Sequence, residues 1–254
     1  MRACINKFLC VILRPSSSIQ LKSVLSALAN ISDEENLILK PIVVADTSVR
    51  IFMLYQNDAA FIERGDKILI LNGVLFNDCL NFTTHGDIKT FINHYDGQAA
   101  LLLLDKNQKR ICAIRDPFGT RTLYFYLKDN LLAISTDIIL LKNLIQKLNM
   151  PLSIDMLTIY EFLILNGIET NRTLFMEMKQ IRAGEYIIFE WSNWKEASSH
   201  YYSPLKEVDT KTNADFQDLL QTINVGLKHI LKTLMQQDFY LIGVPVSGGL
   251  DTTI

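Results

Sequence analysis

Short apolar runs alternate with polar turns along the first two hundred residues. Runs rich in Val, Ile, Leu, Phe and Tyr that are bounded by turn residues are typical of β-strands. The predicted strands are residues 8–13, 41–45, 49–55, 67–71, 99–104, 110–114, 123–127, 131–135 and 185–191. Many short strands at regular spacing, with few helices, predict a sandwich of two sheets with the helices outside.

Helical spacing of apolar residues appears between and after these strands. The predicted helices are residues 19–30, 87–95, 137–148, one that begins near 153–155, and 214–237. The last is the most regular: Asn213 is its expected cap, and an apolar stripe follows from Phe216 to Leu234.

A polar, irregular stretch at residues 191–212 marks the predicted domain boundary. It separates a domain of residues 1–205 from a second one that starts at 213. Residues 213–254 contain a helix, an apolar strand and a Gly-Gly turn, the order in which a parallel α/β domain begins. Because so short a segment cannot bury a core of its own, we expect this second domain to be incomplete.

Composition narrows the class of protein. The 254 residues are 49% hydrophobic and 20% charged, with a net charge of −2, as in ordinary globular proteins. This balance gives no electrostatic reason to expect nucleic acid or membrane as a partner, and no apolar stretch is long enough for a membrane span. The four cysteines show neither a CxxC pair nor zinc spacing, so free thiols in a cytoplasmic protein are expected: Cys4, Cys10, Cys79 and Cys112.

A glycine turn follows the apolar strand near the end of the chain. It consists of Ser247, Gly248, Gly249, Leu250, Asp251 and Thr252. Adjacent glycines leave backbone N–H groups unshielded, and successive N–H groups form an anion-binding concavity. The loop lacks the lysine of a Walker loop. It resembles the pyrophosphate loop, SGGxD[ST], of enzymes that form acyl-adenylates from ATP; the alternative is an ordinary strand-to-helix turn.

A family resemblance is carried by the centre of the chain. Residues 115–124, RDPFGTRTLY, resemble the RDPFGxxPLYY stretch of glutamine-hydrolysing asparagine synthetase. Partial matches lie in the same order at residues 72–77, 86–87, 135–141, 172–175, 182–184 and 247–252. The resemblance implies an α+β fold: a four-layer N-terminal-nucleophile-type sandwich of two antiparallel sheets flanked by helices, followed by the truncated start of an α/β ATP-pyrophosphatase domain.

The catalytic residue of that family's glutaminase is a cysteine exposed at the N-terminus, whose thiol attacks the glutamine amide with help from the α-amine. This sequence begins Met1-Arg2-Ala3-Cys4. Because the bulky Arg2 should block removal of Met1, we expect Cys4 to have no free amine beside it. The glutaminase nucleophile is therefore expected to be absent, as in β-lactam synthetases and lasso-peptide cyclases.

Parts of a glutamine pocket are nevertheless implied by the resemblance. Asn72 and Gly73 would be oxyanion donors, Asp87 would bind the α-ammonium group, and Arg50 would bind the carboxylate. Each has a structural alternative: a hairpin turn for Asn72-Gly73, a helix cap for Asp87 and a surface charge for Arg50. A neighbouring pair, Arg115-Asp116, is expected to be structural, an ion pair that holds a turn.

The function implied by the resemblance is a carbon–nitrogen ligase, which adenylates a small-molecule or peptide carboxylate with ATP and Mg²⁺ and then passes it to nitrogen. The loop at residues 247–252 would hold the pyrophosphate, and Asp251 would also meet the metal. Three alternatives stay open: asparagine formation from free ammonia, intramolecular amide formation as in lasso-peptide cyclases and β-lactam synthetases, and a truncated, non-catalytic scaffold. A separate chain that supplies the rest of the synthetase domain is a possible partner.

Overall fold

The computed structural model describes residues 7–14, 19–44, 49–56, 61–75, 91, 97–192, 194–201 and 216–235. The chain divides into two compact units, Cys4–Val208 and the remainder. The first unit contains two six-stranded sheets, and the second contains helix α5 (Phe216–Met235), whose described side chains are exposed. The strand and loop predicted at residues 241–252 lie outside the described residues.

The first sheet has the order β10-β8-β9-β1-β3-β2, and every pairing in it is antiparallel. Its strands are β1 (Phe8–Leu13), β2 (Ile38–Ile42), β3 (Arg50–Tyr55), β8 (Tyr124–Lys128), β9 (Leu131–Ser135) and β10 (Met178–Gln180). All six residues of the central strand β1 are buried, so both faces of this sheet are covered there.

The second sheet has the order β12-β11-β7-β6-β5-β4 and is also antiparallel. Its strands are β4 (Phe61–Arg64), β5 (Lys67–Leu75), β6 (Gly97–Asp105), β7 (Arg110–Arg115), β11 (Glu185–Glu190) and β12 (Lys195–Tyr201). The inner faces of the two sheets share one apolar core, which includes Ile12, Ile51, Leu102 and Phe189. The predicted two-sheet sandwich is confirmed.

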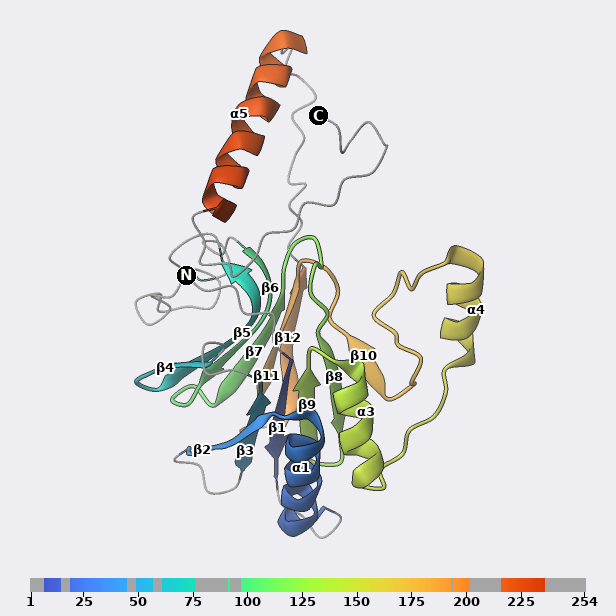
Figure 1. The fold of residues 1–254 in the computed structure, drawn as a ribbon. Helices are drawn as coiled ribbons and strands as arrows, with labels where there is room; N and C mark the ends of the chain where they lie inside the picture. Colours follow the sequence, from blue (N-terminus) through green and yellow to red (C-terminus); the bar gives the residue numbers. More distant parts are fainter. Residues whose placement is uncertain are drawn as a thin grey trace. The chain divides into compact units, whose positions relative to one another are not determined.

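Helices α1 (Leu21–Glu35) and α3 (Ile138–Lys147) cover the outer face of the first sheet (Figure 1). Val24 and Leu141 share a buried cluster with Leu9 of β1, whose neighbours Phe8 and Cys10 point to the opposite face. On the outer face of the second sheet, the buried Phe91 packs in a cluster with Leu101. The rest of the helix predicted at residues 87–95 lies outside the described residues.

Helix α4 (Met156–Leu165) begins directly after Asp155, as predicted, and differs from α1 and α3 in its packing. The Asp155 carboxylate caps it by accepting hydrogen bonds from the backbone N–H groups of Leu157 and Thr158. Thr158 is its only buried residue, and its large apolar side chains are exposed, with Ile164 at 79%.

The described part of the chain contains no helix that is long and apolar enough to cross a membrane.

Three predictions about strands were wrong. The strand expected to end at residue 71 continues to Leu75, because β6 pairs with it along its whole length and Asn72 lies opposite Ala100. The stretch expected to be irregular contains β12, which pairs with β11 despite its polar sequence. The short strands β4 and β10, of four and three residues, were not anticipated, because runs this short carry little periodic pattern and each is defined by pairing with a longer neighbour, β5 or β8.

Candidate functional site

The turn after β7 is held from inside by Arg115. Its guanidinium group donates to three backbone carbonyl oxygens: Arg121 at 2.7 Å, Ile181 at 2.8 Å and Gly119 at 2.8 Å. Gly119 has φ +64°, and a Cβ atom there would lie 2.9 Å from the guanidinium. Burial lowers the pKa of Arg115 from its ordinary value, although the nearby Asp116 opposes this. The side chain therefore fixes the path of the turn.

Asp116 organises the same turn and is completely buried. Its carboxylate accepts hydrogen bonds from the backbone N–H groups of Phe118 and Thr120, both at 3.1 Å, and from the Thr120 hydroxyl at 2.9 Å. The backbone N–H of Arg121 donates to it at 3.3 Å. In this described region no ion pair joins Arg115 and Asp116, because each binds backbone groups of the turn. The two residues hold the turn as expected, but not through the expected ion pair.

A polar pocket opens where this turn meets the start of β1. It encloses about 420 Å³. Both sheets contribute to it, since β1, β3, β8 and β9 belong to one and β5 to the other. The lining residues are Lys7, Gln56, Asn72, Arg121, Thr122, Tyr124, Thr136, Asp137 and Ile138. We refer to this site as the polar pocket.

Lys7 is the first described residue before β1, and its ammonium group is ion-paired. Its Nζ lies 2.9 Å from the Asp137 carboxylate and 3.5 Å from that of Glu35. The hydrogen bond to Asp137 raises the pKa of Lys7 above its ordinary value, with a smaller contribution from Glu35. Lys7 is therefore a cation at neutral pH and not a nucleophilic amine.

The end of β9 is tied to the start of β1 beside this ion pair. The backbone N–H of Phe8 donates to the Thr136 hydroxyl at 3.1 Å, and the Ser135 hydroxyl donates to the Phe8 carbonyl at 2.8 Å. The Asp137 carboxylate also accepts from the backbone N–H of Ile139 at 2.8 Å, which caps α3. These hydrogen bonds fix the side of the polar pocket that contains Lys7 and Asp137.

Tyr124 and Thr122 complete that wall from the end of the turn. The Thr122 hydroxyl donates to the Thr136 carbonyl at 2.8 Å. Burial raises the pKa of the Tyr124 phenol, so it remains protonated and can donate a hydrogen bond at neutral pH. The pocket thus combines one ion pair and the Arg121 guanidinium with neutral hydroxyl and amide groups.

Asn72 lines the polar pocket, but the pair Asn72-Gly73 forms no hairpin turn. Both residues lie inside β5, and Gly73 pairs with Ala99. Gly73 has φ +138°, and a Cβ atom there would lie 2.1 Å from the carbonyl oxygen of Gln98. Only glycine fits so close to the neighbouring strand in this conformation. The turn alternative is therefore wrong, and the structure brings Asn72 to the site.

Arg50, in contrast, is not brought to the polar pocket. It pairs with Leu13 at the far end of β1, whereas Tyr55 pairs with Phe8 at the pocket end. The separation along β3 is about 17 Å at the usual rise of a strand, and the Arg50 guanidinium donates to its neighbour Val49. Gln56, which follows β3, occupies the pocket end instead. Arg50 therefore does not line the polar pocket, and its role in binding a glutamine carboxylate stays a prediction.

The remaining predicted site residues lie outside the described residues: Cys4, Asp87, Ser247, Gly248, Gly249, Leu250, Asp251 and Thr252. The two described cysteines, Cys10 and Cys112, are completely buried, and burial strongly raises the pKa of both thiols. Neither is a reactive thiolate. Within the described ranges, no group of three His, Cys, Asp or Glu side chains is arranged to hold a metal ion.

Sequence reasoning assigned no role to four pocket residues: Lys7, Gln56, Arg121 and Tyr124. Arg121 and Tyr124 lie within the RDPFGTRTLY motif, which was a signal of their position. Lys7 directly precedes a predicted strand, and Gln56 directly follows one. Only the pairing of β1 with β3 shows that these two ends meet.

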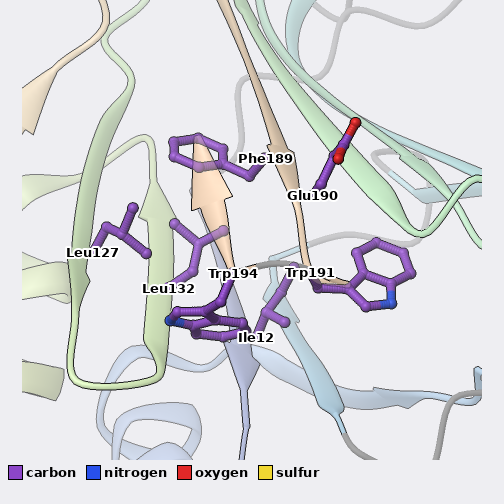
Figure 2. Close-up of a pocket in the computed structure, with 7 residues that line it drawn as sticks. All are labelled: Ile12, Leu127, Leu132, Phe189, Glu190, Trp191 and Trp194. Atoms are coloured by element: carbon purple, nitrogen blue, oxygen red, sulfur yellow. The ribbon is translucent and has the colours of Figure 1, made fainter. Parts of the chain in front are cut away.

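A second, apolar pocket lies between the sheets at the other end of β1 (Figure 2). It holds about 10 Å³, roughly the space of one water molecule. Its lining residues are Ile12, Leu127, Leu132, Phe189, Glu190, Trp191 and Trp194. The Arg14 guanidinium donates to the Trp191 carbonyl at 3.0 Å and lies 5.4 Å from the centre of the Trp194 ring.

Parts of this chain are similar to known proteins. Residues 79–202 match the family model of a glutamine amidotransferase domain. A curated relative, amidase chry2 of Gibberella zeae, is 24% identical over 174 residues, which are 65% of this chain and 23% of the relative. The chain thus spans about a quarter of the length of that relative.

Two solved structures are similar to 78% of this chain at 10% identity, each over 49% of its own chain and with a TM-score of 0.44. One is glutamine phosphoribosylpyrophosphate amidotransferase from B. subtilis, complexed with ADP and GMP, and the other is an allosteric regulatory enzyme of purine biosynthesis. On the match of residues 79–202, the chain contains a glutamine amidotransferase-like domain.

Proposed function

We propose that this chain belongs to an ATP-dependent amide ligase of the asparagine synthetase type, whose glutamine amidotransferase-like domain does not hydrolyse glutamine. One observation supports the ligase most: a glutamine amidotransferase-like domain is followed in the same chain by the sequence SGGLDT. The first part handles amide nitrogen in its family, and the second has the residues of a pyrophosphate loop.

The loss of glutamine hydrolysis is supported by the chemistry of the polar pocket. An amide is cleaved by a thiolate or another activated nucleophile. At the start of β1 the pocket holds the ion-paired ammonium of Lys7, and its described lining contains no thiol. The hydroxyl of Thr136 accepts a backbone hydrogen bond, and Asp137 is engaged by Lys7. Among the described lining residues, neither threonine hydroxyl is hydrogen-bonded to a carboxylate: Thr122 and Thr136 bind backbone groups.

The proposed reaction has two steps. A carboxylate oxygen of the substrate attacks the α-phosphorus of ATP, and pyrophosphate leaves with the electron pair of the broken bond. A nitrogen nucleophile then attacks the acyl carbon, loses a proton, and AMP leaves. The backbone N–H groups of Gly248 and Gly249 and the Ser247 hydroxyl suit the pyrophosphate, and the Asp251 carboxylate suits Mg²⁺, which would neutralise phosphate charge.

The nitrogen source separates the versions of this function. If the domain does not hydrolyse glutamine, as proposed, the nitrogen comes either from free ammonia or from an amine of the substrate itself. The second version is intramolecular amide formation, as in lasso-peptide cyclases and β-lactam synthetases. The substrate is a small-molecule or peptide carboxylate, and a separate chain is a candidate to supply further parts of the synthetase domain.

ATP–pyrophosphate exchange tests the ligase. It is measured with the longest natural translation product that contains these 254 residues, over a panel of amino-acid and peptide carboxylates with Mg²⁺. We expect exchange with at least one carboxylate and its loss in Asp251→Ala, while Asp33→Ala, on the exposed surface of α1, retains it. Exchange that is absent for every carboxylate, or that persists in Asp251→Ala, contradicts the proposal.

Glutamate release from glutamine tests the second half of the proposal on the same protein. We expect no turnover above that of Cys4→Ala. Turnover that disappears in Cys4→Ala would show that Cys4 is a working nucleophile, and the domain would then be a true glutaminase.

A further inference from the structure

We propose that the polar pocket is a binding site for a small carboxylate, held by Arg121, and that the Lys7–Asp137 ion pair makes it discriminate against ligands with an α-ammonium group. This inference rests on the proposed non-hydrolysing role of the domain, since the ligand is bound and not cleaved. It assigns Arg121 and Lys7 roles that the family resemblance does not supply.

Arg121 is positioned by its backbone while its guanidinium remains available. Its N–H donates to Asp116, and its carbonyl accepts from Arg115, so both sides of the residue are fixed. The side chain lines the polar pocket. In the part of the chain that the structure describes, its guanidinium forms no hydrogen bond or ion pair. A planar guanidinium with free donors is the group best suited to bind a carboxylate.

The charges of the lining favour an anion. Lys7, Arg121 and Asp137 are the charged residues among the described lining, so the pocket has one positive charge in excess. Lys7 and Asp137 neutralise each other at 2.9 Å. The excess charge among the lining side chains is therefore that of Arg121, on a turn held by the hydrogen bonds of Arg115 and Asp116.

The same ion pair removes the natural partner of an ammonium group. Asp137 is the one carboxylate among the described lining residues, and its two oxygens are already used by Lys7 and by the backbone N–H of Ile139. The ammonium group of an α-amino acid bound in the pocket would find no uncommitted carboxylate among the described lining residues. A carboxylate ligand without an ammonium group avoids this loss of pairing.

The rest of the lining suits a neutral polar group. The amide of Gln56 and the phenol of Tyr124 provide donor and acceptor groups without charge. A pocket of about 420 Å³ has room for a short chain between these groups and Arg121. The ligand class is therefore a small monocarboxylate with a neutral carboxamide or hydroxyl end.

Isothermal titration calorimetry with three probes of equal chain length tests this: glutaramate, which has a carboxylate and an amide; glutamine, which adds the ammonium; and glutaramide, which has no charge. We expect glutaramate to bind at least tenfold more tightly than glutamine, and glutaramide to bind most weakly. Equal affinity for the three probes, or no binding of glutaramate at millimolar concentration, overturns the proposal.

Variants identify the groups. Arg121→Gln should weaken glutaramate binding by about tenfold or more, because a charge-assisted hydrogen bond is lost. The matched control Arg64→Gln removes the same charge at the Lys67 end of β5, away from Asn72, and should leave affinity unchanged. Arg121→Lys keeps the charge and should retain part of the affinity, which provides a readout if Arg121→Gln does not fold. Full affinity in Arg121→Gln overturns the assignment.

Lys7→Gln tests the discrimination. The change releases Asp137, so glutamine should gain affinity relative to glutaramate. The preference for glutaramate over glutamine should therefore narrow or reverse. An unchanged preference in this variant contradicts the role of the ion pair. Failure of these binding experiments leaves the ATP–pyrophosphate exchange prediction intact, because Arg121 and Lys7 are separate from the 247–252 loop in sequence and in proposed role.

Discussion

The two ends of strand β1 enclose very different spaces. At the Lys7 end, the polar pocket holds about 420 Å³ and is lined by an ion pair, two amides and several hydroxyl groups. At the Arg14 end, about 17 Å away at the rise of a strand, the apolar pocket holds only about 10 Å³. There the residues between β11 and β12 bring Trp191 and Trp194 to the apolar lining (Figure 2).

The difference shows how one sandwich keeps one end open and fills the other. Trp191 is 2% exposed, and indole rings form a large part of the lining at the Arg14 end. Arg14 secures this end by donating to the carbonyls of Trp191 and Ser192. At the Lys7 end, the hydrogen bonds of Asp116 and Arg115 hold the turn itself, so its side chains Arg121, Thr122 and Tyr124 remain available to line a space.

The largest effect is expected from Asp116→Ala at the polar end. The change leaves three N–H groups and one hydroxyl of the turn, all partly buried, without their acceptor, at a cost of about 1–3 kcal/mol each before relaxation. We expect the free energy of unfolding to fall by at least about 4 kcal/mol, measured by urea denaturation. Asp33→Ala on α1 should change it by less than about 0.5 kcal/mol. A loss below 1 kcal/mol at Asp116 would contradict the role of this turn.

A smaller loss of stability is expected at the apolar end. Trp191→Ala removes a buried indole and should cost about 3 kcal/mol, with no effect on glutaramate binding at the polar pocket. Its indole N–H has no partner among the described residues. Trp191→Phe should therefore cost less than about 1.5 kcal/mol, and Trp194→Ala less than Trp191→Ala because Trp194 is only half-buried. A change in ligand affinity would show that the two ends are coupled.

The smallest effect concerns Lys7. Because its ion pair raises the folded-state pKa above the ordinary value, the pair stabilises the protein fully below about pH 10.4, and this contribution disappears as pH rises through the folded-state pKa. Lys7 is 48% exposed, so the contribution should be below about 1 kcal/mol. Urea denaturation of wild type and Lys7→Met should differ at pH 8, and the difference should shrink as pH rises through the folded-state pKa of Lys7. A difference that grows with pH would contradict this ion pair.

Local sequence determined the elements and their caps. Short apolar runs predicted most strands of both sheets, but not β4, β10 and β12. Asp137 and Asp155 mark the starts of α3 and α4 because a carboxylate there accepts the free N–H groups of the first turn. The RDPFGTRTLY motif was also recognisable from local sequence alone. Its polar groups bind mainly within a few residues of one another, so their pattern is visible without the fold.

Tertiary structure decided which residues share the polar pocket. Arg50 and Gln56 stand at opposite ends of one strand, and only the antiparallel register of β1 with β3 shows that Gln56 is the one next to Lys7. Asn72-Gly73 has the sequence of a turn, yet β6 extends the strand through it, since backbone pairing along a whole neighbour outweighs local turn preference. The pocket brings together residues from 7 to 138, and no local pattern encodes contacts between segments so distant along the chain.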